Sequence, residues 1–297
     1  MNNLNGILMV IAAMAFFTLE DMFIKQLSGA LPVGQILICL GTGCALVMAL
    51  LARAQGHRLL APRAWRARPV LRASTEAISA VSFASALALA DISVVAAVFQ
   101  ATPLVITMGA ALFLGEQVGW RRWLAICIGF AGVLLIIRPG LDSFEPAALL
   151  VVVAVLGVAA RDLMTRVMDS AVPSSVVSFQ AFLAVIPAGA LLLWLTPGEA
   201  QSLTGGQWAM VAGGVLFGVM GYYGIVTAMR IGDASAVTPF RYSRLVFSIL
   251  AGVIVFGERP DALTLAGAAL IIGSGLYTFL RERRLARGAR RAALAAA

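Results

Sequence analysis

The chain has 297 residues, of which 61% are hydrophobic and 12% are charged, and its mean hydropathy is +0.95. Soluble domains carry roughly 25% charged residues, so this composition excludes a soluble globular protein and predicts an integral membrane protein. The net charge of +8 comes mainly from arginines between the apolar segments, and it therefore does not identify a substrate.

Ten apolar segments follow one another along the chain, each long enough to cross a membrane as a helix. A crossing helix needs about 20 mostly apolar residues for a hydrocarbon core of about 30 Å. Strands are not expected, because the segments lack the alternating pattern of a membrane barrel. The first segment should stay in the mature protein, because "MNNLN" before it has no basic residue. The predicted spans are residues 4–27, 32–52, 70–90, 92–114, 120–138, 146–168, 173–195, 207–230, 233–256 and 262–280.

The chain repeats itself at a shift of 142 residues, without a gap. Under this shift "ADISVVAAV" falls on "GDASAVTPF", and "FLGEQV" falls on "VFGERP". The chain is therefore expected to contain two five-span units, residues 1–141 and 142–280, followed by a basic tail at 281–297. The identical pairs include Asp91 and Asp233, Ser93 and Ser235, Val95 and Val237, Gly115 and Gly257, Glu116 and Glu258, and Leu134 and Leu276.

An odd number of spans in each unit predicts that the second unit enters the membrane from the opposite side. The fold class is then an all-α membrane protein with ten transmembrane helices arranged as two inverted five-helix repeats. Lys and Arg collect in short cytoplasmic loops. With both termini in the cytoplasm, three basic residues, Lys25, Arg138 and Arg259, lie on the periplasmic side and 16 lie on the cytoplasmic side. The 16 are Arg53, Arg58, Arg63, Arg66, Arg68, Arg72, Arg121, Arg122, Arg166, Arg230, Arg281, Arg283, Arg284, Arg287, Arg290 and Arg291.

The basic tail is interpreted as a flank that sets the orientation of the last helix. A patch for anionic lipid or nucleic acid is the alternative interpretation. No nucleic-acid partner is expected, because the orienting role accounts for the same charges.

Few residues carry catalytic or metal-binding chemistry. Cys39, Cys44 and Cys127 lie in apolar segments, where packing is a more natural role than a disulfide. His57, the single histidine, lies in a basic loop. A membrane enzyme would need a nucleophile, a base or a metal set, so no enzyme, metal or cofactor is expected. A glycine-rich phosphate loop is also missing, so any energy should come from a gradient rather than directly from ATP.

Inverted repeats are typical of secondary transporters, in which the substrate sits near the membrane midplane where the copies meet. The duplicated block, with its Asp-X-Ser-X-Val start and its "GE" end, resembles the drug/metabolite transporter superfamily, in particular the ten-helix EamA-type branch. The resemblance covers nearly the whole chain. Within this branch, the sequence is most similar to bacterial amino acid exporters, including those for aromatic amino acids. The resemblance implies export of metabolites or drugs across the inner membrane. Arg outnumbers Lys 21 to 1, which is typical of a GC-rich bacterial genome.

Ionisable residues inside a span are costly, so each is a functional candidate. Glu20 and Asp162 occupy equivalent positions of the two units. Arg161 and Asp162 are neighbours that point to different faces, so no ion pair between them is expected. For each candidate the alternative is a structural ion pair, or snorkelling to the interface. The candidates are Glu20, Asp21, Glu76, Arg161, Asp162, Arg241 and Arg244.

Other candidates follow from helical spacing and from prolines. Glu76, Ser79 and Phe83 share one face of the third span. Pro103 and Pro239 should kink the fourth and ninth spans and leave free carbonyls beside a cavity. The predicted substrate-binding residues are Glu20, Glu76, Ser79, Phe83, Phe99, Gln100, Tyr222, Tyr223, Tyr242 and Arg244. The "GE" glutamates, Glu116 and Glu258, are expected to cap helix ends instead.

A cavity with one arginine, one acid and several aromatic groups suits a zwitterion, with Arg244 on the carboxylate and an acid on the ammonium. The predicted function is export of small metabolites, above all amino acids, by alternating access. An organic cation would prefer acids and aromatic faces without a central arginine, so a drug or quaternary-cation exporter is the alternative. The expected partners are the substrate, the lipid bilayer and, through Glu20 or Glu76, protons. A receptor or scaffold would show no flux.

Overall fold

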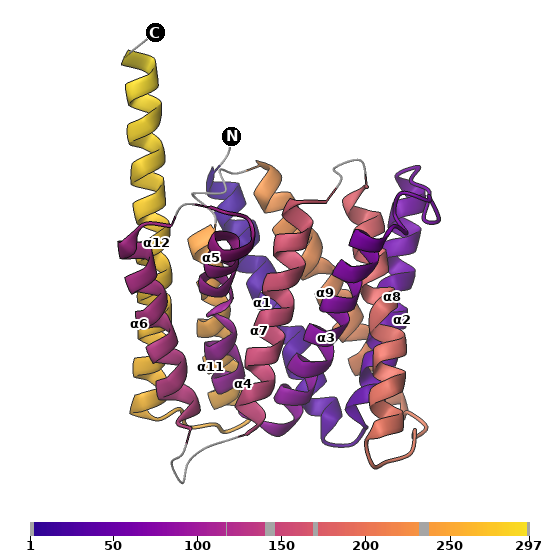
Figure 1. Cartoon of the computed structure of the whole chain (residues 1–297). Helices are drawn as coiled ribbons and strands as arrows, with labels where there is room; N and C mark the ends of the chain where they lie inside the picture. Colours follow the sequence, from indigo (N-terminus) through magenta and orange to yellow (C-terminus); the bar gives the residue numbers. More distant parts are fainter. Residues whose placement is uncertain (1–2, 117, 140–145, 169–171, 232–237, 296–297) are drawn as a thin grey trace.

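The computed structural model describes residues 3–116, 118–139, 146–168, 172–231 and 238–295, and all regular secondary structure within them is helical (Figure 1). Asp233, Ser235 and Val237, from the second copy of the repeated motif, lie outside the described residues. The elements are α1 (Asn3–Ser28), α2 (Val33–Ala54), α3 (Ala67–Leu89), α4 (Ile92–Phe99), α5 (Thr102–Phe113), α6 (Trp120–Ile137), α7 (Ala147–Arg166), α8 (Ser174–Leu195), α9 (Gly205–Ile231), the 3₁₀ helix η1 (Thr238–Tyr242), α11 (Ser243–Val255) and α12 (Ala262–Ala295).

The described residues contain eight segments long and apolar enough to cross a membrane, so the chain is a multi-pass membrane protein. Two of the ten predicted spans fall outside this set. The third corresponds to α3, which carries Arg68, Arg72 and Glu76 in its first half. The ninth corresponds to η1 and α11, and α11 has only 13 residues. The eight are Leu4–Ser28, Val33–Ala54, Ile92–Phe113, Trp120–Ile137, Ala147–Thr165, Ser174–Leu195, Gly205–Ile225 and Ala262–Arg281.

The predicted spans 92–114 and 233–256 are not single helices. The first is interrupted between Phe99 and Thr102, and Pro103 sits in the first turn of α5, where its missing N–H is not needed. In the second, η1 contains Pro239 and leads directly into α11. The two prolines therefore mark breaks in the helices, as their sequence positions predicted.

The ends of α5 and α11 repeat the same local structure 142 residues apart. Each helix is followed by a glycine in the left-handed region, Gly115 with φ 69° and Gly257 with φ 67°. The backbone N–H of the next residue, Glu116 or Glu258, donates to a carbonyl six positions back, at 3.2 and 2.9 Å. Glycine is favoured here because a side chain would strain this conformation.

The predicted boundary between the last span and a separate tail at residue 281 is not a break in the helix. α12 continues to Ala295 and extends well beyond the other helices (Figure 1). The extension is rich in Ala, Arg and Leu and has no proline, so its residues favour a helix without support from a neighbour.

Helices at equivalent positions of the two repeats pack against each other, α2 against α8 and α6 against α12. Both pairs are antiparallel. Gln35, at the start of α2, exchanges two hydrogen bonds with the backbone of Gln201, which follows α8, at 2.6 and 3.0 Å. Arg138, after α6, pairs with Asp261 at the start of α12. The pairs α1 with α9 and α3 with α7 are likewise equivalent when the repeats are exchanged.

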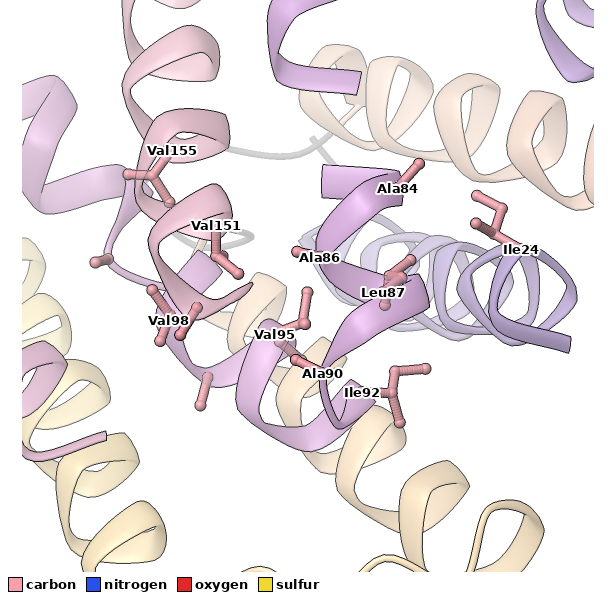
Figure 2. Close-up of a cluster of buried hydrophobic side chains, with 14 of the residues drawn as sticks. Ile24, Ala84, Ala86, Leu87, Ala90, Ile92, Val95, Val98, Val151 and Val155 are labelled. Atoms are coloured by element: carbon pink, nitrogen blue, oxygen red, sulfur yellow. The ribbon is translucent and has the colours of Figure 1, made fainter. Parts of the chain in front are cut away.

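A buried apolar cluster fills the space between α1, α3, α4 and α7 near the lower end of the bundle in Figure 1. Ile24, Leu87, Ile92 and Val151 meet there (Figure 2). Large apolar side chains are also exposed on the outside of the bundle, where Phe113 of α5 is 80% exposed. Apolar side chains therefore both close this end of the bundle and face the surrounding lipid.

Candidate functional site

An ion pair between α1 and α11 lies at the centre of the candidate site. Nη2 of Arg244 donates to both carboxylate oxygens of Asp21, at 2.9 and 2.7 Å. The side chain of Asp21 is 4% exposed and that of Arg244 is 16% exposed. Removing one partner of a buried ion pair strongly destabilises a protein, because the other partner is left as an uncompensated buried charge. The contact therefore fixes the two helices relative to each other.

Three phenyl rings surround the same guanidinium. Cζ of Arg244 lies 5.3 Å from the ring centre of Phe17, 5.4 Å from that of Phe83 and 5.3 Å from that of Phe99. The rings of Phe83 and Phe99 are 4.8 Å apart and tilted by 59°. Aromatic faces attract a cation within about 6 Å. We call these five residues, Phe17, Asp21, Phe83, Phe99 and Arg244, the arginine cage.

The arginine cage lies where two interrupted helices meet. Phe99 is the last residue of α4, and Arg244 follows η1 in the first turn of α11. Gln100, which caps α4, donates from Nε2 to the backbone carbonyl of Arg241 at 3.4 Å. The breaks at Pro103 and Pro239 thus bring side chains from four helices to one point. If these helices were continuous, the same side chains would not converge.

Glu20 precedes Asp21 on α1 and faces α9. A Cβ added at Gly218 would lie 2.6 Å from Oε1 of Glu20, so the carboxylate occupies the space that the glycine leaves. Gly218 is the repeat equivalent of Glu76. Among the residues that the structure describes, Glu20 has neither a hydrogen bond nor an ion pair, so its carboxylate is free to bind a cation or a proton.

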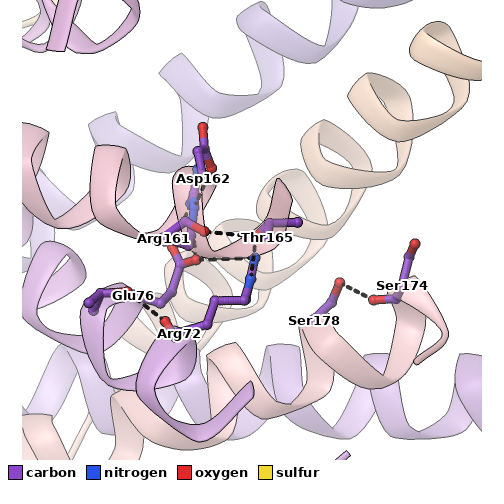
Figure 3. Close-up of polar contacts among 8 residues, drawn as sticks. Arg72, Glu76, Arg161, Asp162, Thr165, Ser174 and Ser178 are labelled. Carbon is purple, nitrogen blue, oxygen red and sulfur yellow. Dashed lines mark hydrogen bonds and ion pairs between the residues drawn. The ribbon is translucent and has the colours of Figure 1, made fainter. Parts of the chain in front are cut away.

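A second polar group, the charge cluster of Arg72, Glu76, Arg161, Asp162 and Thr165, joins α3 to α7 (Figure 3). Nη1 of Arg161 donates to both oxygens of Glu76 at 2.8 and 3.0 Å. Nε of Arg72 donates to the hydroxyl of Thr165 at 2.8 Å, and Nη2 of Arg72 lies 3.9 Å from Glu76. Glu76 is therefore paired within the charge cluster. The sequence pattern had predicted it in one cavity with Arg244.

The expectation that Arg161 and Asp162 would not pair was wrong. Nε of Arg161 donates to Oδ1 of Asp162 at 2.8 Å. Successive Cβ atoms do point in different directions on a helix, but the guanidinium lies several rotatable bonds from the backbone and reaches across this angle. At this position, the length of the arginine side chain outweighs the different directions of the two Cβ atoms.

The other predicted binding residues are distributed over several contacts. The hydroxyl of buried Ser79 donates to the carbonyl of Ala154 at 2.9 Å and so joins α3 to α7. The Tyr242 hydroxyl lies against Gly275 of α12, where any Cβ would overlap it. Tyr222 is half-buried on α9, and Tyr223 is 56% exposed. Of the ten predicted residues, the structure brings Phe83, Phe99 and Arg244 together.

The predicted capping role of the "GE" glutamates is confirmed at Glu258. Its carboxylate, 3% exposed, accepts from the backbone N–H groups of Ile92 and Ser93 at 2.7 and 3.1 Å, and from the Ser93 hydroxyl at 2.7 Å. Nζ of Lys25 lies 3.7 Å away. The end motif of the second repeat thus caps the start motif of the first. Glu116 is the equivalent residue, and the 233–237 segment that would be its counterpart lies outside the described residues.

Two members of the arginine cage, Phe17 and Asp21, were missing from the predicted binding residues. They are one helical turn apart on α1 and therefore share one face of the helix. This spacing of an aromatic residue and an acid within one span is the sequence feature that could have identified them. The structure also contains two cavities of about 350 and 410 Å³, which lie between α6 and α12 and away from the cage.

Comparison with known proteins identifies the family. The model of the EamA-like transporter family matches residues 4–138 and 145–280. A riboflavin transporter of Vibrio cholerae is 32% identical over 194 residues, which are 64% of this chain and 63% of that protein. An S-adenosylmethionine uptake transporter of Rickettsia felis is 28% identical over 208 residues, 68% of each chain. A pseudopaline exporter of Pseudomonas aeruginosa is 26% identical over 273 residues, 90% of this chain and 93% of that protein.

A solved crystal structure has the same fold, with a TM-score of 0.59 and 23% identity, covering 92% of this chain and 98% of the other. The relatives carry different small molecules, and their names include uptake and export. The two family matches coincide with the two units of the internal repeat and leave only a few residues at their junction. This chain belongs to the EamA-like transporter family of the drug/metabolite transporter superfamily.

Proposed function

We propose that this protein moves a small metabolite with a planar ring across the bacterial inner membrane by alternating access. In this arrangement ten helices form two inverted repeats, with α3 and the η1–α11 segment as the third and ninth spans and both termini in the cytoplasm. The antiparallel packing of α2 with α8 and of α6 with α12 supports the inverted arrangement. The distribution of arginines between the spans supports the orientation.

The arginine cage is the observation that supports this substrate class. Arg244 directs Nη2 to Asp21 and is surrounded by the rings of Phe17, Phe83 and Phe99. A flat ring system can stack on these phenyl groups or on the guanidinium plane without separating Arg244 from Asp21. Riboflavin and S-adenosylmethionine, named for the relatives, both contain such a ring. A substrate that offered only a carboxylate would have to compete with Asp21 for Arg244.

Export of amino acids is the second candidate, and Glu20 favours it. Its carboxylate is next to Asp21 in the chain and has no partner among the described residues, so it can receive an ammonium group while Arg244 contacts the carboxylate. An aromatic amino acid would use the phenyl rings as well. This candidate differs from the first in requiring Arg244 to exchange Asp21 for the substrate.

The test is counterflow in liposomes with purified protein and labelled riboflavin, S-adenosylmethionine, phenylalanine and alanine. Ring-bearing substrates should be carried and alanine should not. Phe99→Leu should raise the KM roughly ten-fold, since stacking on one aromatic group contributes about 1–3 kcal/mol. Phe113→Leu, at an exposed phenylalanine on α5, is the matched control and should leave the KM unchanged.

The outcomes separate the candidates. Equal flux of phenylalanine and alanine, both lost in Arg244→Ala, would support amino acid export and contradict the ring proposal. Flux of cationic dyes alone would support the drug-exporter alternative. Because Arg244→Ala leaves Asp21 without its partner, the double variant Asp21→Asn/Arg244→Ala is included, and only monodisperse protein is compared.

Proton coupling is proposed for Glu20 and is tested in the same liposomes. Glu20→Gln keeps the size of the side chain but cannot release a proton, so it should remove the response to a pH gradient while counterflow continues. Glu76→Gln, in the charge cluster, is the comparison. A pH-gradient response that survives in Glu20→Gln and disappears in Glu76→Gln would move the coupling role to α3.

A further inference from the structure

One surface feature that the transport site does not explain is a basic pocket between the start of α6 and the middle of α12. Its walls are Arg121, Tyr277, Leu280, Arg281 and Arg284, and its volume is about 350 Å³. The guanidinium of Arg281 lies beside Gly119, which caps the N-terminus of α6. Among the residues that the structure describes, no carboxylate pairs with Arg121, Arg281 or Arg284. The pocket thus holds three positive charges and suits an anion.

An apolar groove continues from the basic pocket along α6 and α12. It has a volume of about 410 Å³ and shares Arg121 and Tyr277 with the pocket, so the two spaces are contiguous. Leu124 and Ile128 of α6 and Leu270 and Gly273 of α12 line it. A Cβ added at Gly273 would meet nothing within 4 Å, which shows that the groove is open at this point.

The position of the two spaces matches the layers of a bilayer. The apolar stretch of α12 ends at Arg281, so the three arginines lie at the level where the helix leaves the membrane. Trp120, at the first turn of α6, is exposed beside them, and Arg121 stacks over its ring at 5.3 Å. Tryptophan and tyrosine are enriched at the headgroup level of membranes. The charged pocket therefore lies at headgroup depth and the groove at acyl-chain depth.

We propose that this pocket and groove bind one anionic phospholipid, with the phosphodiester on Arg121, Arg281 and Arg284 and an acyl chain along α6 and α12. The charge of the pocket requires an anion, and the groove requires that the anion carry a hydrocarbon chain. A free phosphate would leave the groove empty, and a second copy of this chain would have to bring an acidic group to a site at the bilayer boundary. Basic pockets between transmembrane helices are known to hold anionic headgroups.

The proposal is tested by native mass spectrometry of the full chain, released from detergent after incubation with phosphatidylglycerol, phosphatidylcholine or inorganic phosphate. One phosphatidylglycerol should stay bound under conditions that remove phosphatidylcholine. Arg281→Ala/Arg284→Ala should lower the retained fraction at least ten-fold. Gly273→Leu should lower it as strongly, because the leucine fills the groove while the arginines remain. Gly206→Leu is the matched control, since a Cβ at Gly206 also meets nothing within 4 Å, and it should bind as the unaltered protein does.

Several results would overturn the proposal. Equal retention of phosphatidylcholine would indicate ordinary surrounding lipid. Binding of inorganic phosphate that Gly273→Leu leaves unchanged would assign the pocket to a free anion. A dimer that Gly273→Leu dissociates would assign the groove to a second copy. The thermal unfolding temperature of each variant without lipid must match that of the unaltered protein, and a lipid-induced rise that persists in Arg281→Ala/Arg284→Ala would also contradict the site.

Discussion

At the scale of single residues, the repeated motif acquires a physical explanation. Ser93 and Glu258 belong to opposite ends of the motif and to different repeats, and they meet because the carboxylate caps the N-terminus of α4. A helix N-terminus has backbone N–H groups without partners and a positive dipole end, both of which favour a carboxylate. Lys25, which donates to the carbonyl of Ala90 at 2.6 Å, adds a third helix to this contact.

Glu258→Ala should lower the free energy of unfolding by about 1–3 kcal/mol, because the N–H groups of Ile92 and Ser93 lose their acceptor in a buried position. Glu258→Gln should cost less, since its amide oxygen still accepts one bond. The measurement is thermal unfolding of purified protein, with Glu199→Ala in an exposed loop as the control. Identical unfolding of Glu258→Ala and the unaltered protein would show that the cap does not stabilise the fold.

At the scale of helices, close crossings depend on glycine. The Cβ of any larger residue at Gly34 of α2 would come within 2.5 Å of the Gly189 carbonyl oxygen on α8, and Gly132 and Gly267 show the same contact between α6 and α12. In lipid, helix association relies on this close approach because no hydrophobic effect drives it. The backbones themselves are in contact, so neither helix can accommodate an added atom by moving a side chain.

Gly34→Ala should therefore destabilise the protein by about 1–3 kcal/mol, the usual cost of overpacking. Gly206→Ala, where the added methyl group meets open space, should be neutral or slightly stabilising. Thermal unfolding and the monodisperse fraction after extraction report the difference. If Gly34→Ala were as stable as Gly206→Ala, the backbone contact between α2 and α8 would not be close in the membrane.

At the scale of the whole molecule, the proposed orientation places each end of the bundle on one side of the membrane. Residues 29–32 and 196–204 lie at the lower end in Figure 1, and the segment after α2 lies at the upper end with both termini. The excess of arginines at the upper end is the basis for placing that end in the cytoplasm.

Single cysteines in a cysteine-free background test this assignment. Cysteines at Ser28 and Ser202 should react with an impermeant maleimide added to intact cells, and a cysteine at Gln55 should react only after the cells are opened. Ser28 is the last residue of the first apolar span, and Gln55 and Ser202 lie outside the spans, so folding should tolerate a cysteine at each position. Labelling of Gln55→Cys in intact cells would contradict the cytoplasmic position of the termini.

Local features of the sequence were sufficient for much of the architecture. Long apolar segments predicted membrane helices, because the hydrocarbon core requires internally bonded backbone of a given length. The prolines predicted the interruptions before α5 and α11, because a proline acts within one turn of its own position. The 142-residue repeat predicted the family, and the "GE" motif predicted the cap at Glu258, although its partners remained unknown.

The tertiary structure decided which charges meet. Asp21 and Arg244 are 223 residues apart, and Glu76 and Arg161 are 85 apart. Local spacing in the sequence therefore could not show that these residues form two separate ion pairs rather than one shared cavity. Sequence showed that buried charges need partners, but several acids and arginines could have satisfied one another. The choice depended on how α1, α3, α7 and α11 pack, because an ion pair in a membrane forms between the groups that the packing leaves within reach of each other.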